Sequence, residues 1–180
     1  MSRPEILQLL DRVTTIFVDD LGIGLQHARS WGRGIEFLSK SRQLSIIVAV
    51  QEFLDSFQRY PPASSAAIAE FEKQLGAKFP QDYVAFLLLA NGGEGFVGDN
   101  QPLILWPVEQ LISIHDGYHV RDYAPGLLVF GSNGGGDAYG FDTRSPDWRI
   151  VEMPFVGMDW DEASPVASSF GAFLKHLYES

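Results

Sequence analysis

The sequence contains no cysteine among its 180 residues. Disulfide bonds, thiolate metal sites, iron–sulfur clusters and cysteine nucleophiles are therefore excluded. Long hydrophobic runs are also missing, because the longest, 46–50 and 84–90, are far too short to span a bilayer. No clean apolar run near the start leads to a cleavage site of the small-x-small kind, so the sequence predicts a cytoplasmic protein.

Positive charge is scarce beyond the first third of the chain. There are 13 Lys and Arg against 23 Asp and Glu, a net charge of −10, although the first 60 residues balance seven basic groups against seven acidic ones. Between residues 91 and 165 three arginines oppose twelve acids. Such a surface repels nucleic-acid phosphates and attracts basic proteins. We therefore expect a basic protein partner and no nucleic acid, the alternative being a charge that serves only solubility.

The composition is that of a folded globular protein, with 46% hydrophobic and 20% charged residues. Apolar spacing and capping residues predict helices over roughly 3–18, 46–57, 64–76 and 80–90, and a last helix after Ser168 or Ser169. Short β-branched and aromatic runs predict strands over 103–106, 127–130, 138–141 and 149–153, with 155–157 as a further candidate. This order predicts an α+β fold, in which N-terminal helices pack on a twisted, mostly antiparallel sheet with a C-terminal helix.

Two motifs invite a ligand-binding interpretation. The glycine-rich segment 131–137 follows an apolar strand, but neither a helix nor a lysine follows it, so it predicts a hairpin turn rather than a phosphate site. His115 and His119 have the i, i+4 spacing of zinc ligands, yet Gly117 lies between them and no HExxH motif exists. Surface histidines are the favoured interpretation. We therefore predict no metal, no cofactor and no catalytic residue.

Acidic residues surround Trp160 in the segment 159–162. Paired carboxylates such as Asp159 and Glu162 hydrolyse glycosides when one of them is shielded from water. The same acids can instead contact lysine and arginine on another protein, with the tryptophan supplying aromatic area typical of interface hot spots. The predicted partner-binding residues are Asp116, Asp122, Asp159, Trp160, Asp161 and Glu162.

Three motifs occur in an order that resembles the SUKH superfamily. They are a helix pair over 68–87 ending in Asn91-Gly92-Gly93, a strand, glycine turn and strand over 127–142, and the helix start 169–174. The resemblance covers about 48–178. It implies a protein-binding scaffold with no accepted catalytic residues, in a family that includes yeast cell-wall-synthesis regulators and bacterial immunity proteins against polymorphic toxins.

The resemblance also implies a division of the chain into an N-terminal helical extension, 1–47, and a SUKH-like domain, 48–180. The expected function is that of a bacterial immunity protein, which occludes a toxin, often a nuclease, through an acidic surface. Two alternatives stay open. One is a regulatory or scaffold protein that docks a cellular partner, and the other is a carbohydrate-acting enzyme.

Overall fold

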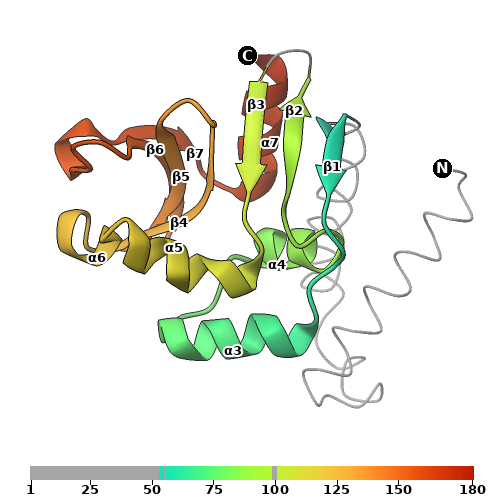
Figure 1. Ribbon diagram of the computed structural model, residues 1–180, viewed down its shortest axis with the longest axis horizontal. Coiled ribbons are helices and arrows are strands. Elements are labelled where there is room, and N and C mark those ends of the chain that lie inside the picture. The colour runs from blue at the N-terminus through green and yellow to red at the C-terminus, as the bar shows by residue number, and fades with distance from the viewer. Residues whose placement is uncertain (1–52, 55, 99–100) are drawn as a thin grey trace, which may run out of the picture.

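The computed structural model describes residues 53–54, 56–98 and 101–180. Within this part of the chain, seven strands form one antiparallel sheet in which each strand pairs with its sequence neighbours (Figure 1). The strands are β1 (Phe57–Arg59), β2 (Gly93–Val97), β3 (Gln101–Leu105), β4 (Leu127–Ser132), β5 (Asp137–Asp142), β6 (Arg149–Pro154) and β7 (Ser164–Ala167). The helices are α3 (Ser65–Leu75), α4 (Gln81–Leu87), α5 (Leu111–Gly117), α6 (Val120–Tyr123) and α7 (Phe170–Glu179), and the 3-10 turns are η1 (Val108–Gln110) and η2 (Trp160–Glu162). The predicted α+β fold with a C-terminal helix is confirmed.

The helix pair before the sheet forms as its capping residues predict. Ser64 caps α3 by accepting a hydrogen bond from the Ala67 amide at 3.1 Å, and Gly76 ends it in the left-handed conformation. Glu72 is buried and fixes the turn into α4, because its carboxylate accepts bonds from the Phe79 amide at 3.0 Å and from Lys78 Nζ at 2.6 Å. The entry angle of α4 is thereby set by a charged side chain as well as by packing.

The Asn-Gly-Gly turn joins the helices to the sheet. Asn91 accepts a hydrogen bond from the Val108 amide at 2.9 Å and donates one to Glu109 Oε2 at 2.7 Å, which holds the start of η1. Gly92 has a positive φ of 90°, and a Cβ there would collide with the carbonyl of Leu105. Backbones approach so closely at this point that only glycine fits.

A large aromatic core fills one side of the sheet, beneath α4 and α7. The largest fully buried side chains include Tyr83, Phe86, Phe130, Phe141, Phe170 and Phe173. Asp82 ties the two helices together, because its Oδ2 accepts hydrogen bonds from the amides of Phe170 at 2.7 Å and Gly171 at 3.1 Å. Burial raises the pKa of the Tyr83 hydroxyl above its ordinary value, so this ring stays neutral in the core.

A second, smaller core lies on the other side of β4, β5 and β6. All six residues of β4 are buried, and the first four, Leu127 to Phe130, alternate between the two cores, as in a strand covered on both faces. The smaller core consists of Val120, Ala124, Leu127, Val129, Ala138, Val151, Met153 and Met158. Two of these residues come from α6 and the turn after it, so the α5–α6 segment forms the cover of this side.

Several predicted boundaries were wrong. The helix over 46–57 does not reach its predicted end, because Phe57 begins β1, and 155–157 forms no strand. The strands β2 and β7 and the helices α5 and α6 were not predicted. Glycine and proline weaken the strand pattern of β2 and β7, whereas pairing with β3 and β6 determines their structure. The helix over 3–18 and the extension over 1–47 lie outside the described residues.

Candidate functional site

Two segments carry the six predicted partner-binding residues and lie side by side. The first, 116–125, contains the end of α5, α6 and the turn into β4, and the second, 155–162, links β6 to η2. The Tyr118 and Phe155 rings stack with centroids 4.2 Å apart, and Trp160 Nε1 donates a hydrogen bond to the Pro125 carbonyl at 3.1 Å. Both segments occupy the end of the sheet away from β1 (Figure 1).

The acids of these segments are exposed to solvent. We call them the acidic surface, and they are Asp116, Asp122, Asp159, Asp161 and Glu162. Arg121 is the only lysine or arginine in the two segments. His119 Nδ1 lies 3.4 Å from Asp122 Oδ2, so this histidine partly offsets one acid when it is protonated. Contacts at both ends of the segments thus assemble acids that are about forty positions apart in the sequence into one region.

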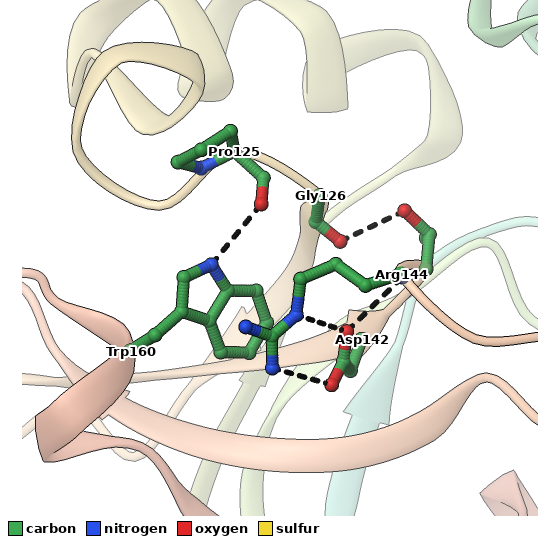
Figure 2. Close-up of polar contacts among 6 residues, drawn as sticks. Pro125, Gly126, Asp142, Arg144 and Trp160 are labelled. Carbon is green, nitrogen blue, oxygen red and sulfur yellow. Dashed lines mark hydrogen bonds and ion pairs between the residues drawn. The ribbon is translucent and has the colours of Figure 1, made fainter.

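Trp160 serves chiefly to anchor η2. Its indole ring is half-buried and packs at the rim of the smaller core, while the Arg144 guanidinium carbon lies 3.3 Å from the ring centroid (Figure 2). Arg144 also forms two hydrogen bonds of 2.9 Å to the Asp142 carboxylate. These hydrogen bonds hold the pKa of Asp142 below its ordinary value. The cation–π contact and the ion pair together fix the segment that carries three of the acids.

The turn between α6 and β4 leaves room for the Arg144 side chain that covers Trp160. Gly126 has a φ of 88°, and a Cβ at this position would lie 2.6 Å from Arg144 Cγ. The Gly126 carbonyl accepts hydrogen bonds from the Thr143 amide and hydroxyl, both at 2.8 Å. Figure 2 shows the indole of Trp160 between the Pro125 carbonyl and the guanidinium of Arg144. Glycine is therefore needed where the α6–β4 turn meets the end of β5.

His115 holds α5 against the sheet and is buried, contrary to the prediction of a surface histidine. Its Nε2 accepts a hydrogen bond from the Val129 amide at 2.9 Å. Val129 lies beyond the two residues of β4 that pair with β3, so the imidazole takes the place of a strand partner. Burial is the main cause that lowers the pKa of His115. The hydrogen bond to the Val129 backbone opposes it, Arg121 lowers the pKa further and Asp116 raises it slightly. The ring is therefore neutral at pH 7.

The two histidines of the zinc interpretation have different surroundings. His115 is bonded to the strand backbone, whereas His119 is exposed and adopts a positive φ of 52° between α5 and α6. Among residues 53–54, 56–98 and 101–180, no three histidine or carboxylate side chains gather closely enough to hold a metal ion. In the same part of the chain no helix is long and apolar enough to cross a bilayer.

The carboxylates of the glycoside-hydrolysis alternative are both open to solvent. Asp159 caps η2, because its Oδ1 accepts a hydrogen bond from the Asp161 amide at 2.9 Å, and Glu162 is exposed in the same turn. General acid catalysis in glycosidases uses a carboxyl group shielded from water. This arrangement does not favour the carbohydrate-acting alternative.

Sequence reasoning missed residues that shape the site. Phe155, Val156 and Arg144 were not among the predicted residues, although Phe155 and Val156 are apolar side chains in a segment otherwise rich in acids. Two apolar residues at 155–156 followed by Gly157 are typical of a strand end. The sequence therefore does not indicate that Val156 is exposed. Arg144 contacts Asp142, two residues before it, and Trp160, sixteen residues after it. No helical or strand period connects these three positions.

Comparison with known proteins identifies the fold family. The family model described as SMI1 / KNR4 family (SUKH-1) matches residues 62–176. The chain belongs to this family. The SUKH superfamily resemblance is thereby confirmed, and the matched range contains both segments of the site. SUKH-1 belongs to a superfamily that is generally non-enzymatic and includes immunity and regulatory proteins.

The chain is also similar to a curated bacterial protein. The Bacillus subtilis (strain 168) protein "Uncharacterized protein YnaB" is 34% identical over 124 residues, which is 68% of this chain and 81% of the relative. That name states no activity. Asp82, Asn91 and Gly92 belong to the motifs that resemble the SUKH superfamily, and in the structure they hold helices and strands rather than the acidic surface.

Proposed function

We propose that this chain is a non-enzymatic protein-binding module of the immunity type, which neutralises a basic toxin domain by covering it. The observation that carries the proposal is the acidic surface, in which two segments hold five exposed acids beside Arg121 and beside Arg144, which is paired with Asp142. Membership of SUKH-1, whose superfamily includes immunity proteins, supports the same function. A nuclease is the expected toxin class, because proteins that bind nucleic-acid phosphates carry basic surfaces.

The mechanism is electrostatic attraction followed by steric occlusion. Exposed acids steer a basic protein toward the surface and raise its association rate, most strongly at low ionic strength. Each exposed pair contributes little binding free energy by itself, about 0 to 1 kcal/mol. The acids therefore act as a group, and the covered toxin loses access to its own substrate.

The test is survival of cells that express this chain together with the toxic domain encoded beside it in its own genome. The decisive variant reverses three acids of the surface: Asp159→Lys, Asp161→Lys and Glu162→Lys. A control variant makes the same charge change at exposed acids elsewhere: Glu70→Lys, Glu94→Lys and Glu179→Lys. Glu179 lies on α7, which covers the opposite side of the sheet.

We expect the unmodified chain and the control variant to protect the cells and the η2 variant to fail. Binding of the purified toxic domain should weaken in the same order, with a steep dependence on salt. Equal protection by both triple variants would contradict the proposal. A basic partner that binds the surface but is harmless when expressed alone would favour the regulatory or scaffold function instead.

A further inference from the structure

Exposed apolar side chains gather on the same two segments as the acids. In the described part of the chain the exposed large apolar residues are Phe96, Tyr118, Tyr123, Val156 and Tyr178. Three of these five lie within 116–125 and 155–162. Single exposed apolar residues are ordinary, whereas a group of them beside charged residues is typical of a protein interface.

Tyr118 and Phe155 form a rigid pair. Their rings are stacked with an interplanar angle of 29°, and Trp106 packs edge-on against Phe155 with centroids 6.4 Å apart. The backbones are fixed as well, because the Tyr118 amide donates to Ile114 O at 3.0 Å and the Phe155 amide donates to Gly136 O at 2.9 Å. A fixed aromatic pair loses little conformational entropy when a partner covers it.

Val156 follows Phe155 directly in the chain. It is 91% exposed, and Gly157 follows it with a φ of 74° in the turn toward η2. A side chain this exposed adds almost no hydrophobic stabilisation to the folded protein, because it is not removed from water on folding. We call Tyr118, Phe155 and Val156 the aromatic ridge.

We infer that the aromatic ridge is the contact core of the partner interface, where it receives an apolar side chain flanked by lysine or arginine. The inference rests on the proposed function and adds which side chains are desolvated on binding. Asp116 and Asp122 lie on either side of Tyr118 in the sequence, and Asp159 follows Val156 by three residues. An apolar centre with an acidic rim fits a partner with an apolar anchor and a basic rim.

Charge also decides between kinds of occupant. A second copy of this chain would place the acidic surface against itself in a two-fold contact, which like charges oppose. Nucleic acid would bring phosphates to the same acids. The occupant that fits both the ridge and its surroundings is therefore a different, basic protein.

The ridge and the acidic surface then have separable kinetic roles. Exposed charges act over distance and chiefly set the association rate, whereas desolvated apolar contacts are lost on separation and set the dissociation rate. Removing an anchor of hot-spot quality speeds dissociation about thirty-fold. Neutralising one rim acid should leave the dissociation rate nearly unchanged.

The first experiment places the photo-crosslinking amino acid p-benzoylphenylalanine at position 156 of the full chain, expressed in its native cells. The control chain carries the same group at position 179, on the opposite side of the sheet. We expect irradiation to yield an adduct with a basic protein at position 156 and none at 179. An adduct at 156 that contains only an acidic protein or a second copy of this chain would overturn the inference.

The second experiment measures dissociation of the protein captured at position 156. We expect Val156→Ser to speed it about ten-fold and Tyr118→Ser about thirty-fold, while Tyr178→Ser, an exposed tyrosine on α7, leaves it unchanged. Thermal unfolding checks that each variant is folded. If Tyr118→Ser does not fold, Val156→Ser alone provides the test. Unchanged dissociation in Val156→Ser would overturn the ridge as the contact core.

Failure of this inference is distinguishable from failure of the proposed function. If cells survive and adducts form only at position 179, the chain neutralises its toxin through another surface, and the ridge is rejected alone. If no adduct forms at either position, the ridge is rejected and the survival assay decides the proposed function. If an adduct forms at 156 with a basic protein that is not toxic, the ridge stands and the immunity function falls.

Discussion

The two sides of the sheet have cores of different composition. Beneath α4 and α7 a continuous set of buried aromatic rings packs against the strands, with neighbouring centroids about 5 to 6 Å apart. Beneath α6 the core consists of small and aliphatic side chains, and its aromatic residues lie half-exposed at the rim. We therefore expect most of the free energy of unfolding to come from the side beneath α4 and α7. The other side holds the exposed acids and aromatic residues.

The largest expected effect comes from removing a ring of the aromatic core. Phe170→Ala should lower the free energy of unfolding by about 3 to 5 kcal/mol, because Phe170 is fully buried against Tyr83 and Phe86. Val120→Ala in the smaller core should cost only about 1.5 kcal/mol, the value of two buried methylene groups. Chemical denaturation measures both variants, and equal losses would contradict the difference between the two sides.

A slightly smaller effect is expected at the Asn-Gly-Gly turn. Gly92→Ala should destabilise the protein by about 3 kcal/mol, since its Cβ would strike the Leu105 carbonyl at a positive φ. The control is Gly117→Ala in α5, where a Cβ meets nothing within 4 Å. That variant should be stabilised by about 0.5 to 1 kcal/mol. The same denaturation series compares them, and a tolerated alanine at position 92 would refute the packing argument.

The smaller core should also be the part that responds to acid. The pKa of His115 is lowered in the folded protein, so the unfolded chain binds the proton first as pH falls. The stabilisation is therefore complete above about pH 6.5, the ordinary histidine value, and is lost as pH falls from there through the folded pKa. The protection factor of the Val129 amide, which is its exchange rate in the unfolded chain divided by its rate in the protein at the same pH, should fall over this range, because protonated Nε2 cannot accept its hydrogen bond.

His115→Gln is the matched control for this pH effect. The glutamine amide oxygen can accept the Val129 hydrogen bond but does not titrate in this range. The fall in the protection factor of the Val129 amide between pH 7 and 5 should disappear in the variant. A pH response that persists in His115→Gln would assign the effect to groups other than His115.

The smallest effect on stability is expected at Arg144. Arg144→Ala should cost under about 1 kcal/mol, because the arginine is half-exposed and its ion pair is screened by solvent. Locally, amide exchange over 159–163 should increase, since the variant loses the cation–π contact that holds Trp160. Arg149→Ala, an exposed arginine on β6, is the control. Unchanged exchange over 159–163 would show that the Trp160 hydrogen bond to Pro125 suffices to hold η2.

Local signals in the sequence predicted the scaffold well. Ser64, Gly76, Pro80 and Ser169 mark helix ends by their side-chain or backbone chemistry, and the structure places each of them there. The glycine-rich hairpin between β4 and β5 is likewise confirmed, with Gly134 and Gly136 at positive φ. These elements could be predicted because each depends on neighbours within four residues.

The candidate site depends instead on contacts between distant residues. Nothing near Tyr118 in the sequence indicates that Phe155 will stack on it, and nothing near Arg144 indicates the indole of Trp160. His115 was misread because a histidine beside two acids suggests a polar surface, whereas a strand amide without a strand partner recruits it inward. Of the side chains that join the two acidic segments, Trp160 was predicted for the site, whereas Phe155 and Arg144 were not.

The bond from Asp82 to the start of α7 joins residues 88 positions apart. Phe170, Phe173, Leu174 and Leu177 reach the aromatic core only through that last helix. During synthesis, the rings already translated therefore cannot complete the aromatic core until α7 has emerged from the ribosome. A chain cut short at position 168 would carry both acidic segments in full and still lack the helix that closes the fold.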